Sequence, residues 1–499
     1  MPGFISDTSS AMLEFIIKLH SEITIKSKSV RKRQTKLLQQ NLKTILLQLE
    51  PSIQIQSHWD HLMVLVPEAK PELRAKLIER LACIPGIAQF AEMQSSSFSS
   101  LDDIYQQVLP VFADKITGKS FCVRVRRAGT HDFTSTEAER YIGGGLNQQV
   151  PSARVQLKKP DFTVQLEIRK DKLIMVRAQY PGMGGFPLPS QSDALSLISG
   201  GFDSAVSSYL MIKKGMRNHY LFFNLGGKAH ETGVREIAYF LWQKYSLSHK
   251  VKFISVDFAP VVAEILEKSE PGLMGVILKR MMMRAAAEIA EQLGIPAIVT
   301  GESAGQVSSQ TLDNLNVIDR VTPLLILRPL IAHDKQDIID IARKIGVEDM
   351  AASMPEYCGV ISNKPTVKAR LADVEANEQR FDPEVLASVV AEAKILDIRT
   401  IDYQSSQQVT TVEAVQAMPA DAIVLDIRRP DECEQTPLEV AGHPVVELPF
   451  YKISSQFSSL AQDKLYYLYC DQGVMSRMQA LLLKDEGFQN VGVYQKPAS

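Results

Sequence analysis

The stretch "ALSLISGGFDSAVSSYL", residues 194–210, constrains the fold more than any other part of this sequence. An apolar run leads into Ser199, Gly200 and Gly201, and a helical pattern begins beside Asp203. Glycines in such a turn let backbone N–H groups face a phosphate, and the amino end of the next helix favours negative charge. The stretch therefore predicts a phosphate site, with a plain glycine turn as the alternative. Because it lacks a Gly-Lys-Ser/Thr ending, it is not the phosphate loop of kinases and GTPases.

The surrounding sequence predicts a doubly wound parallel sheet, because buried apolar runs alternate there with long helical patterns. These runs are "ALSLI", "NHYLFFNLG", "VKFISVDF", "AIVTGE" and "LLILRPL". The glycine- and proline-rich segment 180–190 indicates a connection to a preceding region. From Leu13 to about Tyr180, short strands and helices alternate as in two small α+β units. A last strand and helix alternation, from "AIVLDIRRPDE" onward, predicts a small α/β domain.

The overall net charge of −2 conceals two regions of opposite charge. Residues 1–180 have a net charge of +7 and residues 181–499 have −9. The segment 26–43 has seven basic residues and no acidic one, which fits either a solvated helix face or a phosphate-binding surface. A strand at "FCVRVRR" would present arginines on one face, and two basic surfaces in one region favour a nucleic-acid partner. The candidate contacts are Lys26, Arg31, Lys32, Arg33, Arg124, Arg126 and Arg127.

Cysteine content and hydropathy indicate the compartment. The five cysteines are odd in number, far apart and without a Cys-x-x-Cys pair, which argues against a disulfide framework and against a bound zinc ion. No apolar run approaches the roughly 18 residues of a membrane span, and the first residues lack the pattern of an export signal. We therefore expect a cytoplasmic protein with no membrane partner and no tightly bound metal.

Cys470 lies in "YYLYCDQGVMSR", between an apolar run and a glycine-containing loop that leads into a helical pattern. Such a loop would stabilise a thiolate through its backbone N–H groups and the amino end of the helix. The alternative is a small buried side chain, which is the usual role of a free cysteine and the one we expect of Cys83, Cys122 and Cys433. A cysteine-dependent phosphatase would need arginine at position 476, where this chain has Ser476.

Several motifs resemble those of known families. The pattern Ser-Gly-Gly-x-Asp-Ser resembles the pyrophosphate loop of ATP pyrophosphatases, which cleave ATP to AMP and pyrophosphate and adenylate a substrate oxygen. Together with "MGVILKRMMMRAA", "VTGESAGQVSSQTLDNL", "ILRPLIAHDK", "MPEYCGVIS" and "YCDQGVMSR", the chain resembles the long form of the tRNA 4-thiouridine synthetase family over nearly its whole length. The segment "RYIGGGLNQQV" lies where that family has its tRNA-binding THUMP domain, although a helix end with a glycine-rich turn is the alternative.

The resemblance implies an architecture of several α/β and α+β domains. The expected parts are an extension at 1–11, a ferredoxin-like domain at 12–74, a THUMP domain at 75–179, an ATP pyrophosphatase domain at 180–395, a linker at 396–417 and a rhodanese-like domain at 418–499. Met12 is an alternative start. The oligomeric state stays open, with a homodimer among the choices.

The resemblance also implies an ATP site, with ATP and Mg²⁺ as substrate. Asp203 would help to hold Mg²⁺ and the phosphates, and Lys335 would act as a point cation. The remaining residues that the resemblance implies are Leu197, Ile198, Ser199, Gly200, Gly201, Ser204, Lys279, Gly301 and Gln310.

For the cysteines, the resemblance implies sulfur transfer. A cysteine desulfurase carrying pyridoxal phosphate would load a persulfide onto Cys470, and ATP would adenylate O4 of uridine 8 of tRNA. Cys358 would resolve the sulfur and form a disulfide with Cys470, which a thiol reductant must open. Many rhodaneses have arginine where this chain has Met475, and Arg477 lies two residues later, so the source of positive charge beside Cys470 stays open.

Two other functions compete with tRNA thiolation. The last domain alone could pass sulfur to a small ubiquitin-like carrier protein of the ThiS type for thiamine thiazole synthesis, and the family is linked to both activities. The other is an amide-forming ligase of the same superfamily, which would require neither the basic region 1–180 nor the last domain.

Overall fold

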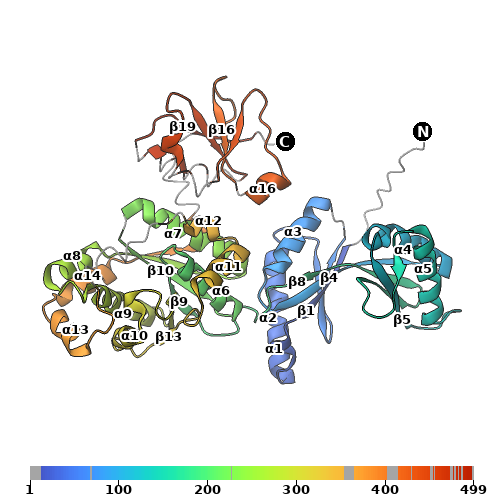
Figure 1. Cartoon of the computed structure of the whole chain (residues 1–499), viewed down its shortest axis with the longest axis horizontal. Helices are drawn as coiled ribbons and strands as arrows, with labels where there is room; N and C mark the ends of the chain where they lie inside the picture. Colours follow the sequence, from blue (N-terminus) through green and yellow to red (C-terminus); the bar gives the residue numbers. More distant parts are fainter. Residues whose placement is uncertain are drawn as a thin grey trace. The chain divides into compact units, whose positions relative to one another are not determined.

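The computed structural model describes residues 13–67, 70–225, 227–352, 354, 365–401, 414–428, 430–449, 453, 456–471, 476, 479–480, 483–484 and 487–496. It divides into two compact units, Met1–Ser190 with Lys213–Gly215, and Gln191–Ile212 with Met216–Ser499 (Figure 1). Within the described part, no helix combines the length and the apolarity needed to cross a membrane.

The first unit contains an eight-stranded sheet in the order β2-β3-β1-β4-β8-β7-β5-β6. Its strands form because apolar residues alternate with polar ones, as in β1, where Leu13, Phe15, Ile17 and Leu19 are buried. The strands are β1 (Leu13–Leu19), β2 (Gln54–Ser57), β3 (His61–Val66), β4 (Ile87–Ser97), β5 (Ser120–Ala128), β6 (Arg154–Val155), β7 (Phe162–Arg169) and β8 (Lys172–Pro181).

The first unit has two halves, each with its own helices, and both halves contribute strands to the one sheet. The helices are α1 (Ser21–Thr24), α2 (Lys28–Leu46), α3 (Pro71–Ala82), α4 (Leu101–Ile116) and α5 (Ser135–Gln149). The order β1-α2-β2-β3-α3-β4 is that of a ferredoxin-like fold, so this half continues through β4, beyond residue 74. The three glycines of "RYIGGGLNQQV" lie inside α5 and form no turn. A Cβ at Gly145 would lie 2.4 Å from the ring of Tyr105, so glycine there permits close packing of α4 and α5.

The second unit contains a six-stranded sheet in the order β13-β12-β9-β10-β11-β14. The first five strands are parallel, as the sequence predicts, and β14 pairs antiparallel with β11 and extends past residue 395. These strands are β9 (Ala194–Leu197), β10 (Asn218–Asn224), β11 (Lys252–Asp257), β12 (Ala297–Val299), β13 (Leu325–Leu327) and β14 (Lys394–Asp397). The sequence prediction lacks the antiparallel strand β14. Its first two residues, Lys394 and Ile395, are exposed, so the strand forms no buried apolar run.

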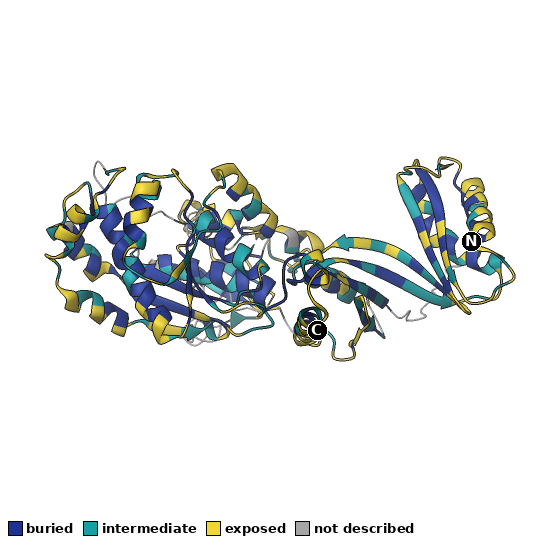
Figure 2. Ribbon diagram, turned by 90° about the horizontal axis from the view of Figure 1, so that it is seen from below, coloured by how far each residue is buried: buried dark blue, intermediate teal, exposed yellow. Residues whose placement is uncertain are grey.

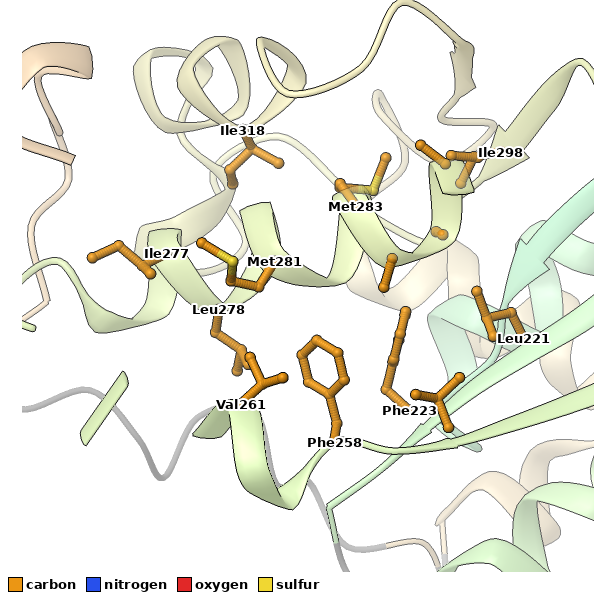
Figure 3. Packing of buried hydrophobic residues seen from close by; sticks show 14 of the residues in the cluster. Leu221, Phe223, Phe258, Val261, Ile277, Leu278, Met281, Met283, Ile298 and Ile318 are labelled. Atoms are coloured by element: carbon orange, nitrogen blue, oxygen red, sulfur yellow. The ribbon is translucent and has the colours of Figure 1, made fainter. Parts of the chain in front are cut away.

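Helices cover this sheet and bury their apolar sides against it (Figure 2). They are α6 (Phe202–Lys213), α7 (Gly227–Leu241), which continues as a π-helical turn at Trp242–Ser246, α8 (Ala259–Lys268), α9 (Met274–Gln292), α10 (Leu312–Asp319), α11 (Lys335–Ile345), α12 (Glu348–Ala352), α13 (Leu371–Glu378) and α14 (Pro383–Ala391). Figure 3 shows α9 in this core, with Met281 near Phe258 and Val261, and Ile318 of α10 on another side of the helix.

A smaller sheet in the second unit consists of five parallel strands in the order β15-β19-β18-β16-β17. These are β15 (Ala414–Val415), β16 (Ile423–Asp426), β17 (Val445–Glu447), β18 (Tyr466–Tyr469) and β19 (Val491–Tyr494), and the helix α16 (Pro430–Gln435) follows β16. The alternation of strands and helices that the sequence predicts in this part of the chain is present. Cys470 directly follows the central strand β18.

Candidate ATP and thiol sites

The glycine turn lies at the point where the strand order of the six-stranded sheet reverses. From β9 the chain proceeds to β10 and β11 on one side, and then to β12 and β13 on the other. The carboxyl ends of β9 and β12 therefore flank a crevice, and ligands of open α/β sheets bind at such a point. Asp203 follows β9, Gly301 follows β12, and Lys335 begins α11 after β13.

Ser204 closes the turn between β9 and α6. Its hydroxyl donates to the carbonyl oxygen of Gly201 at 3.0 Å and accepts from the backbone N–H of Ser199 at 3.2 Å. Gly200 has a φ of +88°, which favours glycine. The exposed Ser199 and the partly exposed Gly201 thus lie at the amino end of α6, where the helix dipole favours an anion.

Asp203 joins the turn to two other loops. Its carboxylate accepts from Nζ of Lys335 at 3.0 Å and from Nε2 of Gln306 at 2.9 Å. The side chains of Asp203 and Lys335 are 23% and 42% exposed, so solvent and ligands can reach the pair. The structure therefore brings together Asp203 and Lys335, which lie 132 positions apart in the sequence. It adds Gln306, which sequence reasoning missed although it lies in the same "GESAGQ" segment as Gly301.

Gly301 permits the close approach of β12 to this turn. A Cβ at this position would lie 2.6 Å from the carbonyl carbon of Asp203 and 2.8 Å from the backbone nitrogen of Ser204. Any larger residue would push the two loops apart, because both contacts are with backbone atoms. The role of Gly301 is thus to set the spacing of the crevice.

Lys279 reaches this region through a buried carboxylate. Nζ of Lys279 donates to Glu302 at 2.9 Å, and Nε of Arg328 donates to the other oxygen of Glu302 at 2.7 Å. Burial alone would raise the pKa of Glu302, but the charges of Lys279 and Arg328 outweigh it and hold that pKa below its usual value. Arg328 also pairs with Asp319. Glu302 and Arg328 were missed by sequence reasoning, because a buried ion network leaves no periodic pattern.

The other expected ATP-site residues lie at the same edge of the sheet. Leu197 ends β9 and is partly exposed, whereas Ile198 is buried and donates its backbone N–H to Leu221. Gln310 accepts from the backbone N–H of Ser303 at 3.2 Å, which fixes the loop after β12. In the described part of the chain, no group of three or more histidine, cysteine, aspartate and glutamate side chains lies close enough together to hold a metal ion.

Cys470 lies at the carboxyl end of β18 and is partly exposed. Its Sγ accepts from the backbone N–H of Ser476 at 3.3 Å and lies 3.5 Å from the hydroxyl of Ser476. Ser476 thus holds the position where a phosphatase has arginine, and it offers two donors to a sulfur anion. Met475 and Arg477 lie outside the described residues, as does Cys358.

Arg428 follows β16, the strand that pairs with β18, and its charge is already bound by acidic side chains. It forms a bidentate pair with the buried Asp426 and also contacts Asp471 at 3.3 Å. Cys433 is buried, and burial followed by the charge of Asp426 raises the pKa of its thiol to about 12. Cys433 and the buried Cys122 therefore fit the structural role expected of them, whereas Cys83 is half-buried.

Both expected basic surfaces are present in the first unit. On β5, Val123 and Val125 are buried while Arg124 and Arg126 are exposed, as the alternation predicts. Cys122 departs from this alternation, because the first part of β5 is buried on both faces. On the other surface, Lys26, Lys32 and Arg33 are exposed on and before α2, and Arg31 is half-buried. Arg127 is half-buried and lies 3.0 Å from His131.

Comparison with known proteins agrees with this architecture. The family model for thiamine biosynthesis protein (ThiI) matches residues 189–382, the THUMP domain model matches 98–176 and the ThiI ferredoxin-like domain model matches 14–91. The crystal structure of a 4-thiouridine synthetase–RNA complex with bound ATP is similar in fold, with a TM-score of 0.67, 23% sequence identity, and coverage of 77% of this chain and 99% of that chain.

Two relatives extend the likeness to nearly the full length. The tRNA sulfurtransferase of Shewanella sp. (strain W3-18-1) is 58% identical over 483 residues, which are 97% of this chain and 100% of the relative. That of Shewanella baltica (strain OS155) is 57% identical over the same length and coverage. The resemblance that the motifs indicated is confirmed, and this chain belongs to the tRNA sulfurtransferase family of enzymes.

Proposed function

We propose that this protein uses ATP to replace the O4 oxygen of uridine 8 in tRNA with sulfur, giving 4-thiouridine. The observation that carries this proposal is the convergence of Asp203, Lys335 and the Ser199–Ser204 turn at the reversal point of a parallel sheet, in a chain of the tRNA sulfurtransferase family. The related 4-thiouridine synthetase binds RNA and ATP, which supports tRNA and ATP as the two substrates.

The first proposed step is activation of the uridine. Its O4 attacks the α-phosphorus of ATP, pyrophosphate leaves, and the oxygen becomes part of a good leaving group. Asp203 fits as the carboxylate that holds the Mg²⁺ of MgATP, since Mg²⁺ usually takes one or two carboxylates together with phosphate oxygens. Lys335 then turns from Asp203 to the phosphates and stabilises the charge that develops there.

The second proposed step transfers sulfur from a rhodanese-like domain that begins near residue 418. A cysteine desulfurase carrying pyridoxal phosphate loads a persulfide onto Cys470, where the backbone N–H and the hydroxyl of Ser476 stabilise the anion. The terminal sulfur attacks C4, the C4–O bond breaks, and AMP leaves. Cys358 then attacks Sγ of Cys470, which leaves the sulfur on tRNA and forms a Cys358–Cys470 disulfide. A thiol reductant supplies the two electrons that reopen it.

Nucleoside mass spectrometry of tRNA tests the function directly. A strain that lacks the gene should contain no 4-thiouridine, and the wild-type gene should restore it. The Cys470→Ala, Cys358→Ala and Asp203→Ala variants should not. Normal 4-thiouridine in cells with the Asp203 or Cys470 variant would refute the proposal.

We also propose that Cys470 passes sulfur to a ThiS-type carrier protein for thiamine thiazole synthesis. The family model that matches residues 189–382 is described as a thiamine biosynthesis protein, which favours this second role. The two roles differ in their need for ATP activation by the catalytic domain. Asp203→Asn should abolish tRNA thiolation and preserve growth without thiazole, whereas Cys470→Ser should abolish both. Equal loss of both functions in the Asp203 variant would contradict this division.

A further inference from the structure

The most exposed large apolar side chain in the described part of the chain is Trp59, at the tip of the hairpin between β2 and β3. It is 82% exposed, whereas Trp242, the only other tryptophan of the sequence, is 6% exposed. Single exposed apolar residues are ordinary on protein surfaces. The surroundings of Trp59 decide whether this one has a role.

The hairpin tip holds Trp59 away from the core. The backbone N–H of His58 donates to the carbonyl oxygen of His61 at 2.9 Å and closes the turn. The rings of His58 and His61 stack at 4.6 Å between centroids with 14° between their planes. Asp60 pairs with His61 at 2.7 Å. These contacts fix the backbone on both sides of Trp59. The ordered hairpin therefore holds the exposed Trp59 side chain outside the core.

The one cation that lies over the ring of Trp59 in the described residues is Arg31 of α2. Its guanidinium carbon is 5.3 Å from the ring centroid, a cation–π distance. α2 is fixed against the same hairpin, because Leu38 and Leu42 are fully buried and Gln39 donates to the carbonyl oxygen of Ile55 at 3.1 Å. An aromatic face and a guanidinium are thus held together by two packed elements, with most of the ring open to solvent.

Charge identifies the kind of partner that fits this surface. Residues 26–43 contain seven basic and no acidic residues, and Lys28, Lys32, Arg33 and Lys36 are exposed on α2. The second most exposed large apolar residue, Ile25 at 78%, lies just before the same end of α2. Unpaired RNA bases stack on aromatic rings and guanidinium planes while basic side chains hold the phosphates. A protein partner would instead need an acidic surface with an apolar centre.

We infer that Trp59 and Arg31 form a stacking platform for an unpaired base of the tRNA substrate, with the basic residues of α2 holding the adjoining phosphates. This inference rests on the proposed function for the identity of the RNA. It adds a contact that reads an unpaired base in the ferredoxin-like half, apart from the THUMP region and from the chemistry.

Binding of an unmodified tRNA transcript to the full-length protein tests the platform. Trp59→Ala should weaken binding about tenfold, because stacking of one base contributes about that factor, and Trp59→Phe should restore most of it. The slope of affinity against salt should be unchanged in Trp59→Ala, since no charge is lost, and should fall by about one in Arg31→Ala. Val446→Ala, which removes an exposed apolar side chain of β17, is the matched control and should change affinity less than about twofold.

Two further RNAs and the protein's own fluorescence complete the test. A blunt RNA duplex should bind wild type and Trp59→Ala equally. A transcript trimmed of its unpaired 3′ end identifies the source of the base, since the Trp59 effect should vanish if the base comes from that end and persist if it comes from a loop. Saturation with full transcript should quench tryptophan emission in wild type and leave it unchanged in Trp59→Phe, where only the buried Trp242 remains.

Unchanged transcript affinity in Trp59→Ala would overturn the inference. So would equal weakening for the blunt duplex, or a loss of sulfur loading by the desulfurase with tRNA affinity intact, which would make the hairpin a protein docking site. These outcomes are independent of the proposed function, which is tested by thiolation of tRNA in the wild-type protein and in the Asp203 and Cys470 variants.

Discussion

The candidate ATP site and the Cys470 site both follow a parallel strand, but the charged and polar groups around them come from different parts of the chain. Each lies at the carboxyl end of a parallel strand, β9 in one case and β18 in the other. At the ATP site, side chains far apart in sequence provide the charges, and Lys335 is available to a ligand. At Cys470 the donors are local and come from Ser476, while Arg428 is bound to Asp426. The comparison indicates that the charges beside the glycine turn depend on tertiary contacts, whereas the donors to Cys470 come from a residue only six positions away.

If the two sites perform separate half-reactions, Cys470→Ser has the largest and most selective effect. It should reduce 4-thiouridine formation by at least about a thousandfold, because serine cannot carry a persulfide. ATP hydrolysis or ATP–pyrophosphate exchange in the presence of tRNA should continue at nearly the wild-type rate. Radiolabelled sulfur transfer from the desulfurase measures the first effect, and loss of both activities would show that the sites are not separable.

Asp203→Asn should give the opposite result. The variant keeps its hydrogen-bonding shape but loses the charge that binds Mg²⁺, so tRNA-dependent pyrophosphate release should fall by about a hundredfold or more. Persulfide loading of Cys470 should remain normal. Pyrophosphate release and thiolate-trapping mass spectrometry measure the two results on one preparation, and a failure of sulfur loading here would break the comparison.

Lys335→Ala should have the next largest effect on activity. Loss of one cation that stabilises the developing phosphate charge should lower kcat about a hundredfold, with a smaller rise in the KM for ATP. Lys344→Ala removes an exposed lysine from the other end of α11 and is the control. If the two variants have the same kcat, Lys335 serves only to neutralise Asp203.

Glu302→Gln tests whether the buried network positions Lys279. Removing the carboxylate leaves Lys279 without its partner and Arg328 with Asp319 alone, so the free energy of unfolding should fall by about 3 kcal/mol and the KM for ATP should rise. Asp319→Asn removes only the more exposed partner of Arg328 and should cost less than about 1 kcal/mol. Urea unfolding together with ATP titration separates the two effects. A stable variant with an unchanged KM would contradict a positioning role.

Asp193→Asn should have the smallest effect on activity, because Asp193 lies at the amino end of the sheet, away from the crevice. Burial would raise its pKa, but hydrogen bonds and charges from His219 and Arg217 lower it to about 2, below the 3.8 of an unperturbed aspartate. The folded state therefore gains stability above pH 4 that is lost as the pH falls toward 2, amounting to about 2 kcal/mol. The free energy of unfolding of the variant should be lower than that of the wild type at pH 7, and the gap between the two should shrink below pH 4. The kcat of the variant should equal that of the wild type.

The sequence predicted these two sites to different extents for physical reasons. The parallel strands and the Ser199–Ser204 turn are local patterns, so periodicity and turn chemistry predicted them. Asp203 and Lys335 were paired only through the family resemblance, because 132 positions separate them. Glu302, Arg328 and Gln306 were missed because their roles depend on tertiary contacts. Ser476 was read only as an argument against a phosphatase, and its contact with Cys470 required the structure.

The most direct test of the account follows the oxygen that sulfur replaces. A tRNA carrying ¹⁸O at O4 of uridine 8 is incubated with the protein, ATP and a persulfide donor, and the released AMP is analysed by mass spectrometry. If the ATP site adenylates O4 and sulfur from Cys470 displaces AMP at C4, the AMP should carry one ¹⁸O for each 4-thiouridine formed. Formation of 4-thiouridine with unlabelled AMP would contradict it.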